Sequence, residues 1–454
     1  MRKRLGMCFV FMIATPLFFA ETPASGVEIG GSDPIRGTIS LVSVGPSEGG
    51  GDGPSFSGTE KGLGVSAHGR YVVFTSYATD LVANDTNGLP DVFVRDMAAG
   101  RTELASVGVG GVQGNGESRQ GSISADGRFV AFTSIASNLL PGDTNDSADV
   151  FVRDLLAGRT MLVSVGLNGP ADLGGHQPDI SSDGGHVAFT SGATNLVPDD
   201  TNNTADIFVR DLAAGRTERV SLTSEGLQSD AFSSDSAVSA SGRFVAFMSA
   251  ASLAPCPSSP IITDSVVYVR DRETNTTRAV SCGGPVDPRS FIIDTAYPAI
   301  SNDGRFVLFT VIGWLGVGVD PIPNVWLRDL HTDALELISA DYLGRPSSAV
   351  GPVFRNDVSA DGRYVAFGTP GRMTRGDYGD LSDVFRRDRE TGSLLWITQR
   401  QDQTDRFGGR IGSFGPAISD DGLHVAFESD DERLVRGGGA AGFDTYLWSA
   451  VPPS

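Results

Sequence analysis

A hydrophobic pattern recurs along the chain at a nearly constant spacing. Each copy has a valine three residues after a fixed glycine, a phenylalanine five residues after it and a serine three residues before it. The glycines recur at intervals of 57 to 62 residues, at positions 69, 127, 184, 242, 304, 362 and 422. Seven matches at four positions establish an internal repeat, which governs the interpretation of the whole sequence.

Each unit predicts four short β-strands. In the second unit, residues 121–124 lead into the turn Ala-Asp-Gly-Arg at 125–128, and residues 129–133 follow as a second strand. Asp-Gly between apolar residues is a strong hairpin signal, because glycine adopts the positive φ that the turn needs. Residues 149–154 and 160–165 supply the third and fourth strands. The middle strands carry apolar residues on both faces, which indicates a sheet packed between two others.

Sheets covered on both faces must bury one another, and radial closure of such sheets gives a β-propeller. The seventh unit has only three predicted strands, the last ending at Trp448. Residues 38–44, Thr-Ile-Ser-Leu-Val-Ser-Val, match the fourth-strand pattern of residues 160–165. We therefore predict an all-β, seven-bladed propeller of four-stranded blades over residues 38–454, closed by an N-terminal strand that completes the last blade.

The repeat carries a family resemblance. Residues 124–132 read Ser-Ala-Asp-Gly-Arg-Phe-Val-Ala-Phe, and residues 359–367 read Ser-Ala-Asp-Gly-Arg-Tyr-Val-Ala-Phe. Both resemble the TolB-type, WD-repeat-like propeller repeat of exported bacterial proteins. The resemblance implies a propeller over essentially the whole mature chain. It implies no particular activity, because the same repeat occurs in periplasmic interaction proteins and as the non-catalytic domain of certain peptidases.

The first 24 residues have the pattern of a secretory signal peptide. Basic residues at 2–4 precede an almost wholly apolar stretch over 5–20, and small residues at 22–24 suit cleavage. An uncleaved anchor is the alternative, but the stretch is short for a span of about 20 residues. We predict removal of residues 1–24, a linker over 25–37 and a periplasmic or secreted protein.

The net charge of the protein limits the kinds of molecule that it can bind. The formal net charge is -20 at pH 7, and an acidic surface repels phosphate backbones and anionic lipid heads. We therefore expect no nucleic acid and no direct membrane insertion, but a monomer that binds another protein. Lys3 and Lys61 are the only lysines, a bias that we attribute to genome composition.

Two cysteines follow the signal peptide, Cys256 and Cys282. An even pair in an oxidising compartment indicates one disulfide, and two small core residues are the alternative. Both cysteines fall on the same predicted rim of one blade, which would allow the bridge.

Loops between second and third strands share an acidic pattern, Asp-Thr-Asn followed by an aspartate six residues after the first. Oxygen ligands at alternating positions of a tight loop are typical of calcium sites. The alternative is a turn in which Asp and Asn side chains bind their own backbone. Calcium is thus the one cofactor that the sequence suggests. The candidate ligands, including the outer pair of a fourth loop, are Asp85, Asn87, Asp91, Asp143, Asn145, Asp149, Asp200, Asn202, Asp206, Asp377 and Asp383.

The strand order places tight turns on one rim and long loops on the opposite rim. Loops 134–148 and 108–120 exceed the usual length of about 4 to 6 residues, so a localised function is expected on this long-loop rim. Loop 311–319 is the most apolar of these loops, and Trp314 in it is a candidate contact for a protein partner. A loop that folds onto its own blade is the alternative. Polar residues at the mouth of the channel are candidates for ligand binding. They are Arg119, His176, Asp235, Tyr297 and Arg355.

Three functions fit this pattern. The favoured one is an exported, non-catalytic binding or scaffold propeller, because the sequence has no nucleophile elbow, phosphate loop or metal triad. The alternative is a propeller enzyme, a lyase or hydrolase with its site at the channel mouth. The third is a structural module stabilised by calcium. Arg-Asp pairs such as Arg95-Asp96 end the third strand of six units, which is too often for a catalytic group, so we interpret the aspartates as caps of the following turn.

Overall fold

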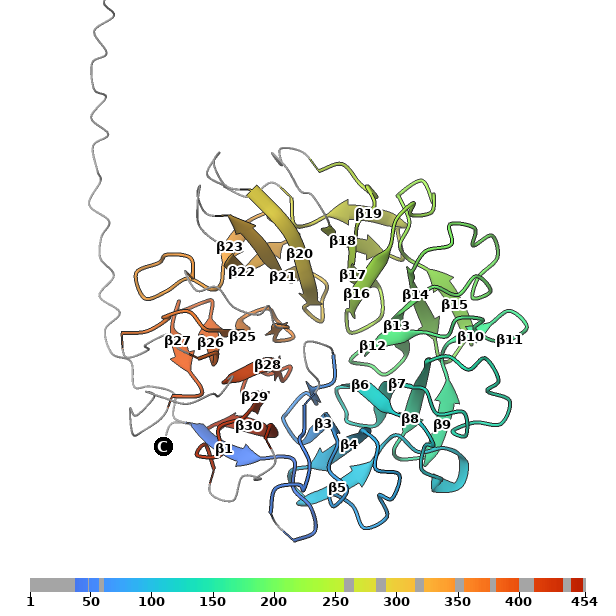
Figure 1. Cartoon of the computed structure of the whole chain (residues 1–454). Helices are drawn as coiled ribbons and strands as arrows, with labels where there is room; N and C mark the ends of the chain where they lie inside the picture. The colour runs from blue at the N-terminus through green and yellow to red at the C-terminus, as the bar shows by residue number, and fades with distance from the viewer. Residues whose placement is uncertain are drawn as a thin grey trace, which may run out of the picture. The chain divides into compact units, whose positions relative to one another are not determined.

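Strands make up almost all of the regular structure of the protein (Figure 1). The computed structural model describes residues 37–47, 49–56, 61–256, 265–282, 291–314, 322–347, 355–375, 381–399, 412–435 and 442–451. The predicted signal peptide and all but Gly37 of the predicted linker lie outside these ranges. Within them, the one helical element is the 3-10 turn η1 (Val109–Gly111), and no helix is long and apolar enough to cross a membrane.

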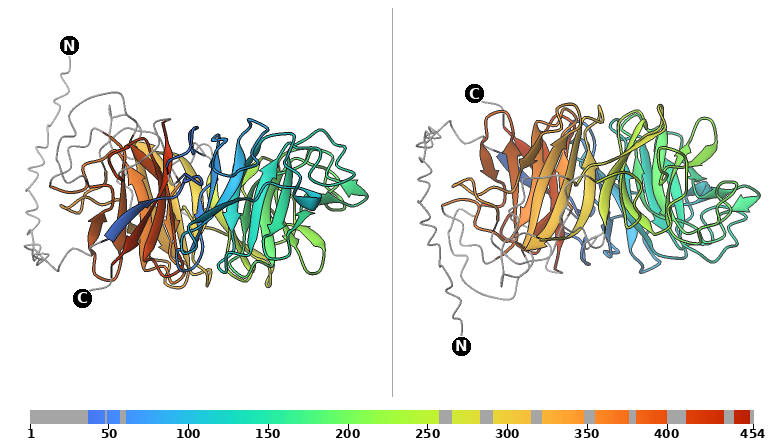
Figure 2. Two further views of the ribbon diagram at one scale, coloured as in Figure 1. Left: turned by 90° about the horizontal axis from the view of Figure 1, so that it is seen from below. Right: turned by 90° about the horizontal axis from the view of Figure 1, so that it is seen from above.

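The strands form seven four-stranded antiparallel sheets around a common centre, so the predicted fold class is confirmed (Figures 1 and 2). A further short pair, β10 (Val165–Gly166) and β11 (Gly169–Pro170), lies between blades 2 and 3. From the inside outward, blades 1 to 3 are β2 (Gly64–Val65), β3 (Tyr71–Ser76), β4 (Asp91–Asp96), β5 (Arg101–Leu104); β6 (Ser118–Ile123), β7 (Phe129–Ser134), β8 (Asp149–Asp154), β9 (Arg159–Leu162); and β12 (His176–Ile180), β13 (His186–Ser191), β14 (Asp206–Asp211), β15 (Arg216–Arg219).

Blades 4 to 7 follow in the same order. They are β16 (Ser233–Val238), β17 (Phe244–Ser249), β18 (Val266–Asp271), β19 (Thr276–Ala279); β20 (Phe291–Ile300), β21 (Phe306–Trp314), β22 (Ile322–Asp329), β23 (Leu335–Leu337); β24 (Asp357–Val358), β25 (Tyr364–Thr369), β26 (Asp383–Asp388), β27 (Leu394–Trp396); and β28 (Ser413–Ile418), β29 (His424–Ser429), β30 (Asp444–Ala450), β1 (Gly37–Leu41).

Blade 7 combines strands from both ends of the described chain. Strand β1 pairs antiparallel with β30, from Gly37 opposite Ala450 to Leu41 opposite Tyr446. The regular ladder is shorter than the strand predicted over 38–44, although the Val42 amide still donates a hydrogen bond to a backbone carbonyl of β30 (2.8 Å). In Figure 1, β1 lies beside β30 at the edge of the ring.

The repeated valines and phenylalanines form the core between blades. Every one of them is at most 1% exposed. In six blades the phenylalanine ring packs against an aromatic ring on the next strand, with centroids 5.7 to 6.0 Å apart. Such a pair stabilises the fold by about 0.5–1.5 kcal/mol in addition to the effect of burying its apolar area. The repeated valines and phenylalanines are therefore the residues that pack each blade.

Serine, aspartate and glycine of the repeat build the tight turn. In blade 2, Ser124 Oγ accepts a hydrogen bond from the Phe129 amide (3.0 Å) and donates one to the Asp126 carboxylate (2.6 Å). Gly127 has a φ of +74°, and a Cβ there would lie 2.0 Å from the ring of Tyr71 in blade 1. Glycine is required both by the backbone conformation and by the aromatic ring of the preceding blade.

This contact between a ring and a glycine recurs around the whole circle. His424 of blade 7 covers Gly69 of blade 1, where a Cβ would lie 2.3 Å from the imidazole. His186 and His424 therefore occupy a packing position that other blades fill with phenylalanine or tyrosine. The residues that cover the following blade are Tyr71, Phe129, His186, Phe244, Phe306, Tyr364 and His424.

Backbone hydrogen bonds close a circle at the same tight-turn rim. The Ala67 amide of blade 1 donates to the Ala125 carbonyl of blade 2 (2.9 Å), and the Asp421 amide of blade 7 donates to the Ala67 carbonyl (3.3 Å). One such bond joins each pair of neighbouring blades. The accepting carbonyls are those of Ala67, Ala125, Ser182, Ala240, Asn302, Ala360 and Asp420.

The aspartates that end the third strands cap the turn that follows them, as predicted. Asp96 Oδ1 accepts the amides of Ala98 (3.1 Å) and Ala99 (3.0 Å). Arg70, which directly precedes β3, binds the same carboxylate (2.8 Å).

Blade 5 departs from the repeat in the length of its strands. Val311 and Trp314, which we predicted in a loop, belong to β21 and pair with Thr295 and Phe291 of β20. The predicted loop was therefore wrong over residues 311–314, because the apolar run continues the hairpin of β20 and β21. The rest of that segment and the Trp314 side chain lie outside the described residues.

Blade 4 carries the predicted disulfide. Cys256 and Cys282 are bonded in the structure, with Cα atoms 5.5 Å apart. The bond closes a loop of 26 residues between the end of β17 and the end of β19.

Closure of blade 7 by β1 generates a first prediction. Deleting residues 25–46 should expose the edge of β30 and cause aggregation, since an unpaired edge strand can add strands from other molecules. Deleting residues 25–34 alone is the control, because it leaves β1 in place. Size-exclusion chromatography with light scattering checks the outcome, and a longer deletion that stays monomeric and melts like the control would contradict it.

Candidate functional site in the central channel

The innermost strands are interrupted by a bulge at the central channel. The register of β6, β12, β16 and β20 shifts at this point. Gln120, Gln177, Asp235 and Tyr297 lie there with φ between +53° and +60°, which is uncommon for residues other than glycine. Bulges of this kind re-aim side chains. All four residues stand seven positions before a turn glycine, and Arg355 holds that place in blade 6.

Three of the predicted binding residues meet at this level. Arg355 Nη2 donates a hydrogen bond to the Asp235 carboxylate, and the Arg355 guanidinium lies 5.3 Å from the centre of the Tyr297 ring. Gln177 Nε2 also donates to Asp235 (3.2 Å). The Arg355 side chain is only 14% exposed, so Arg355 is part of an internal network rather than an open rim surface.

The other two predicted residues stand one position earlier on their strands. Arg119 forms an ion pair with Glu117 (3.0 Å), and its guanidinium lies 5.0 Å from the centre of the Tyr77 ring. His176 is exposed at the start of β12. The described contacts thus join three of the five predicted residues, Asp235, Tyr297 and Arg355.

Lys61, which we had not predicted as a site residue, enters the channel from blade 1. Its Nζ lies 3.2 Å from Asp179 Oδ1 on blade 3 and donates to the Ser236 carbonyl on blade 4. The side chain therefore crosses the channel and is 12% exposed. Two ion pairs, Lys61 with Asp179 and Arg355 with Asp235, thus span the channel. We call Lys61, Gln120, Gln177, Asp235, Tyr297 and Arg355 the channel girdle.

Two aspartates connect neighbouring blades inside the channel. Asp179 of blade 3 accepts the Val238 amide of blade 4 (2.8 Å), and Asp357 of blade 6 accepts the Ile418 amide of blade 7 (2.9 Å). Both stand five positions before a turn glycine. Each carboxylate satisfies a backbone group that would otherwise lack a partner beside the bulge.

A cavity of about 180 Å³ continues from the girdle along the channel, and all seven blades contribute to its wall. Its charged lining residues are Lys61, Asp179, Arg355, Asp357 and Asp420. Burial raises the pKa of Asp357 to about 7; the amides of residues 358 and 418 oppose this effect, and Asp179 and Asp420 reinforce it. The cavity therefore contains a carboxyl group that changes charge near neutral pH.

Polar side chains also meet at the tight-turn end of the cavity. Ser182 Oγ of blade 3 donates to Asn302 Oδ1 of blade 5 (2.9 Å). Asn302 is hydrogen-bonded to Asp420 of blade 7, and burial raises the pKa of Asp420. These three residues precede the turn glycines by two positions, at the backbone circle described above.

A signal for the missed residues was present in the repeat. Five positions before the turn glycine, the other blades carry only small residues, namely Gly64, Ser122, Ala237, Ala299 and Ala417. Acids at this position, in Asp179 and Asp357, are therefore exceptions to the repeat. Lys61 is the single lysine after the signal peptide, and it stands eight positions before Gly69. Comparison of equivalent positions would have brought all three to attention.

The acidic loops of blades 1 to 3 form Asx turns. In blade 2, Asn145 Oδ1 accepts the Ser147 amide (3.1 Å) and Asn145 Nδ2 donates to Asp149 Oδ2 (2.8 Å). Asn87 and Asn202 make the same two contacts. Asp377 of the fourth loop lies outside the described residues, and Asp383 accepts a hydrogen bond from Thr398 (2.6 Å).

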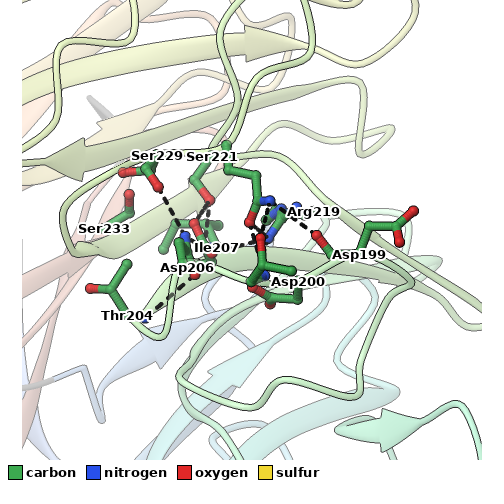
Figure 3. Close-up of polar contacts among 12 residues, drawn as sticks. Asp199, Asp200, Thr204, Asp206, Ile207, Arg219, Ser221, Ser229 and Ser233 are labelled. Atoms are coloured by element: carbon green, nitrogen blue, oxygen red, sulfur yellow. Dashed lines mark hydrogen bonds and ion pairs between the residues drawn. The ribbon is translucent and has the colours of Figure 1, made fainter.

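The three loops differ in what faces the first aspartate. In blade 3, Arg219 Nη1 lies 2.9 Å from Asp200 Oδ1 and 3.4 Å from Asp206 Oδ2 (Figure 3). In blade 1, Gln113 Nε2 donates to Asp85 (2.7 Å) and Asp91 (3.1 Å). In these two blades the side chain of an arginine or a glutamine thus occupies the position beside the aspartates that a bound cation would need.

Blade 2 has no equivalent of these two donors. Leu162 stands at the position of Arg219, and Pro170 stands at the position of Gln113. Burial raises the pKa of both Asp143 and Asp149. Among the described residues, no group of three or more His, Cys, Asp or Glu side chains has the spacing of a metal site. Calcium stays a proposal, and blade 2 is the blade in which neither of these two donors faces the aspartates.

Several solved protein structures resemble the fold of this chain. The chain resembles oligogalacturonate lyase from Vibrio parahaemolyticus, with 11% identity and a TM-score of 0.53 over 92% of this chain and 98% of that chain. It also matches a prolyl endopeptidase, with 13% identity and a TM-score of 0.48 over 87% of this chain and 51% of that chain. A third match is TolB from Acinetobacter baumannii, with 15% identity and a TM-score of 0.39 over 84% of this chain and 80% of that chain. No family model and no curated protein sequence matches the chain. The protein is a seven-bladed β-propeller, and at these identities the likeness extends to the fold alone.

Asp357 generates a pH prediction. Its pKa is about 7 in the folded protein against an ordinary value of 3.8, so its contribution to stability is complete below the ordinary value and is lost as pH rises through 7. Asp357→Asn cannot ionise and should remove this loss, although the variant is less stable overall because an amide offers one acceptor oxygen instead of two. Urea unfolding at about pH 5.5 and about pH 8 measures the difference. Equal pH dependence in variant and parent would contradict the assignment.

The loop of blade 2 generates a metal prediction. If Asp143 and Asp149 bind calcium, millimolar calcium should raise the melting temperature and a chelator should lower it, because a ligand that binds the folded state stabilises it. Asp143→Ala should abolish the shift. Asp230→Ala, which removes an exposed acid from another loop, should retain it. If calcium does not change the melting temperature of the parent protein, these loops are plain Asx turns.

Proposed function

We propose that the protein is an exported propeller that binds another protein through its long-loop rim and does not catalyse a reaction. The observation that carries this proposal is a set of exposed apolar side chains at the channel-side end of that rim. Tyr77, Ile135, Leu173 and Phe232 lie on blades 1, 2, 3 and 4 in turn, and they are between 40% and 62% exposed.

The positions of these residues follow from the strand register. Tyr77 and Ile135 directly follow β3 and β7, while Phe232 directly precedes β16. The Ile135 amide donates to the Glu117 carbonyl (3.0 Å) just before β6, and the Ala250 amide donates to the Phe232 carbonyl (3.0 Å). Tyr77, Ile135 and Phe232 therefore border the first two strands of a blade, and Leu173 stands three positions before β12, the first strand of blade 3. Exposed apolar groups on consecutive blades are typical of a surface that contacts a protein.

The internal bonding of the channel girdle also favours binding over catalysis. Asp235 is held by Arg355 and Gln177, and Lys61 is held by Asp179. The charges of Asp235 and Arg355 are neutralised by each other inside the protein, so this pair structures the channel mouth. The sequence resemblance to TolB-type repeats of exported interaction proteins agrees with this role, and export itself rests on the pattern of residues 1–24.

Charge suggests the chemistry of the partner. The protein has a formal net charge of -20, so a partner that surrounds an apolar contact with basic side chains would be attracted and oriented. The second candidate function is a propeller enzyme, favoured by one observation, the cavity with an aspartate of pKa about 7 next to the girdle.

The rim proposal predicts the effect of removing the apolar side chains. The triple variant Ile135→Ser, Leu173→Ser and Phe232→Ser should lose at least about tenfold in affinity for the partner, since each apolar contact in an interface contributes on the order of 1 kcal/mol. Its melting temperature should change little, because exposed substitutions cost within about 0.5 kcal/mol each.

The matched control is Leu156→Ser, which removes a leucine that is 81% exposed in the turn after β8, on the opposite rim. Immobilised parent and variants are compared in retention of envelope proteins by quantitative mass spectrometry. A protein that the parent and the control retain, and that the triple variant releases, is the expected partner. Equal retention by all three would refute the rim surface, and substrate turnover that disappears in Asp357→Asn would favour the enzyme.

A further inference from the structure

Lys61 is chemically different from every other basic side chain of the mature protein. All the others, apart from histidines, are arginines. Arginine remains charged in every protein environment, whereas a lysine can lose its proton when it is buried. In this chain the only side-chain amine after the signal peptide is the one that lies in the channel cavity.

The position of the amine suits a ligand that enters the cavity. Nζ reaches across the channel to Asp179 and the Ser236 carbonyl, so it stands at the long-loop end of the cavity rather than in a crevice of its own blade. A volume of about 180 Å³ exceeds that of a cavity known to hold benzene. A ligand with a few non-hydrogen atoms would therefore fit beside the amine.

The groups around Lys61 set its protonation. Burial has the largest effect and lowers the pKa of Lys61. The nearby charge of Arg355 lowers this pKa further, whereas Asp179 and Asp235 raise it. The amine is therefore more often neutral than that of an exposed lysine at the same pH, and a neutral amine is a nucleophile.

We propose that the Lys61 amine is a covalent binding site for a small, uncharged aldehyde that enters the channel cavity. The neutral Nζ attacks the carbonyl carbon, a carbon–nitrogen bond forms, and the carbonyl oxygen takes up a proton as the nitrogen gives one up. The second N–H proton and the new hydroxyl group then leave as water when the carbon–oxygen bond breaks, which gives an imine. One aldehyde and one amine thus yield one imine and one water. No oxidant or reductant is needed.

Asp179 is a positioning residue in this reaction. It holds the amine at 3.2 Å across the channel, and the protonated imine would keep a positive charge beside the same carboxylate. Asp179, Asp357 and Asp420 outnumber Arg355 among the other charged residues that line the cavity, so a carboxylate or phosphate on the ligand would be repelled. The ligand class is accordingly a neutral aldehyde with a short or hydroxylated chain.

Glycolaldehyde is the probe for this site, and glyoxylate is its anionic counterpart. The folded protein is incubated with each aldehyde and cyanoborohydride, which traps an imine as a stable secondary amine, and adducts are located by peptide mass spectrometry. With one lysine in the mature chain, the N-terminal amine provides an internal reference. We expect a glycolaldehyde adduct at Lys61 that forms several times faster at pH 7 in the folded protein than in the urea-unfolded chain, because burial lowers the pKa of the amine and enlarges its neutral fraction.

Three further outcomes decide the proposal. Lys61→Arg keeps the charge and should abolish the adduct at this position with the N-terminal adduct unchanged. Asp179→Asn should move the pH profile of labelling to lower pH, which a merely structural role would not do. Glyoxylate should react more slowly than glycolaldehyde at Lys61. Labelling of Lys61 no faster in the folded than in the unfolded chain would overturn the site, and faster labelling by glyoxylate would overturn the ligand class; neither result bears on the rim surface.

Discussion

The structure depends on a closed circle of contacts at the tight-turn rim. One backbone hydrogen bond joins each pair of neighbouring blades there, and an aromatic or histidine ring of each blade covers the turn glycine of the next. Both sets of contacts include the step from blade 7 back to blade 1, through Asp421 with Ala67 and His424 with Gly69. A blade cannot change its turn without breaking contacts with both neighbours, which explains why the turn serine and glycine recur in all seven units.

The bulges lie at the opposite end of the channel from this circle of contacts, so the residues there are freer to differ between blades. Bulges release the inner strands from regular pairing, and the residues at the bulge differ from blade to blade. Glutamine, aspartate, tyrosine and arginine occupy the same repeat position in Gln120, Asp235, Tyr297 and Arg355. Opposite charges from distant blades then meet across the channel, and the same arrangement leaves a lysine and a titrating aspartate beside a cavity.

The acidic loops show how equivalent backbones acquire different chemistry. Each loop keeps the asparagine that closes the Asx turn and donates to the buried aspartate. The compensation of the negative charge is supplied by Arg219 in blade 3 and by Gln113 in blade 1. Blade 2, with Leu162 and Pro170 at those places, has neither donor. A pattern of ligand-type residues therefore did not by itself distinguish a metal site from an internal ion pair.

The sequence by itself determined the number of blades, the four strands of each and the turn chemistry, because these are set by contacts within one repeat and its neighbour. It also indicated that residues 38–44 complete the last blade, since a fourth strand was missing there. Only the tertiary structure decided the channel. Lys61 meets Asp179 across 118 positions of sequence, and Arg355 meets Asp235 across 120. No local pattern encodes such pairs, because they depend on which blades face each other and on how far a bulge turns each side chain.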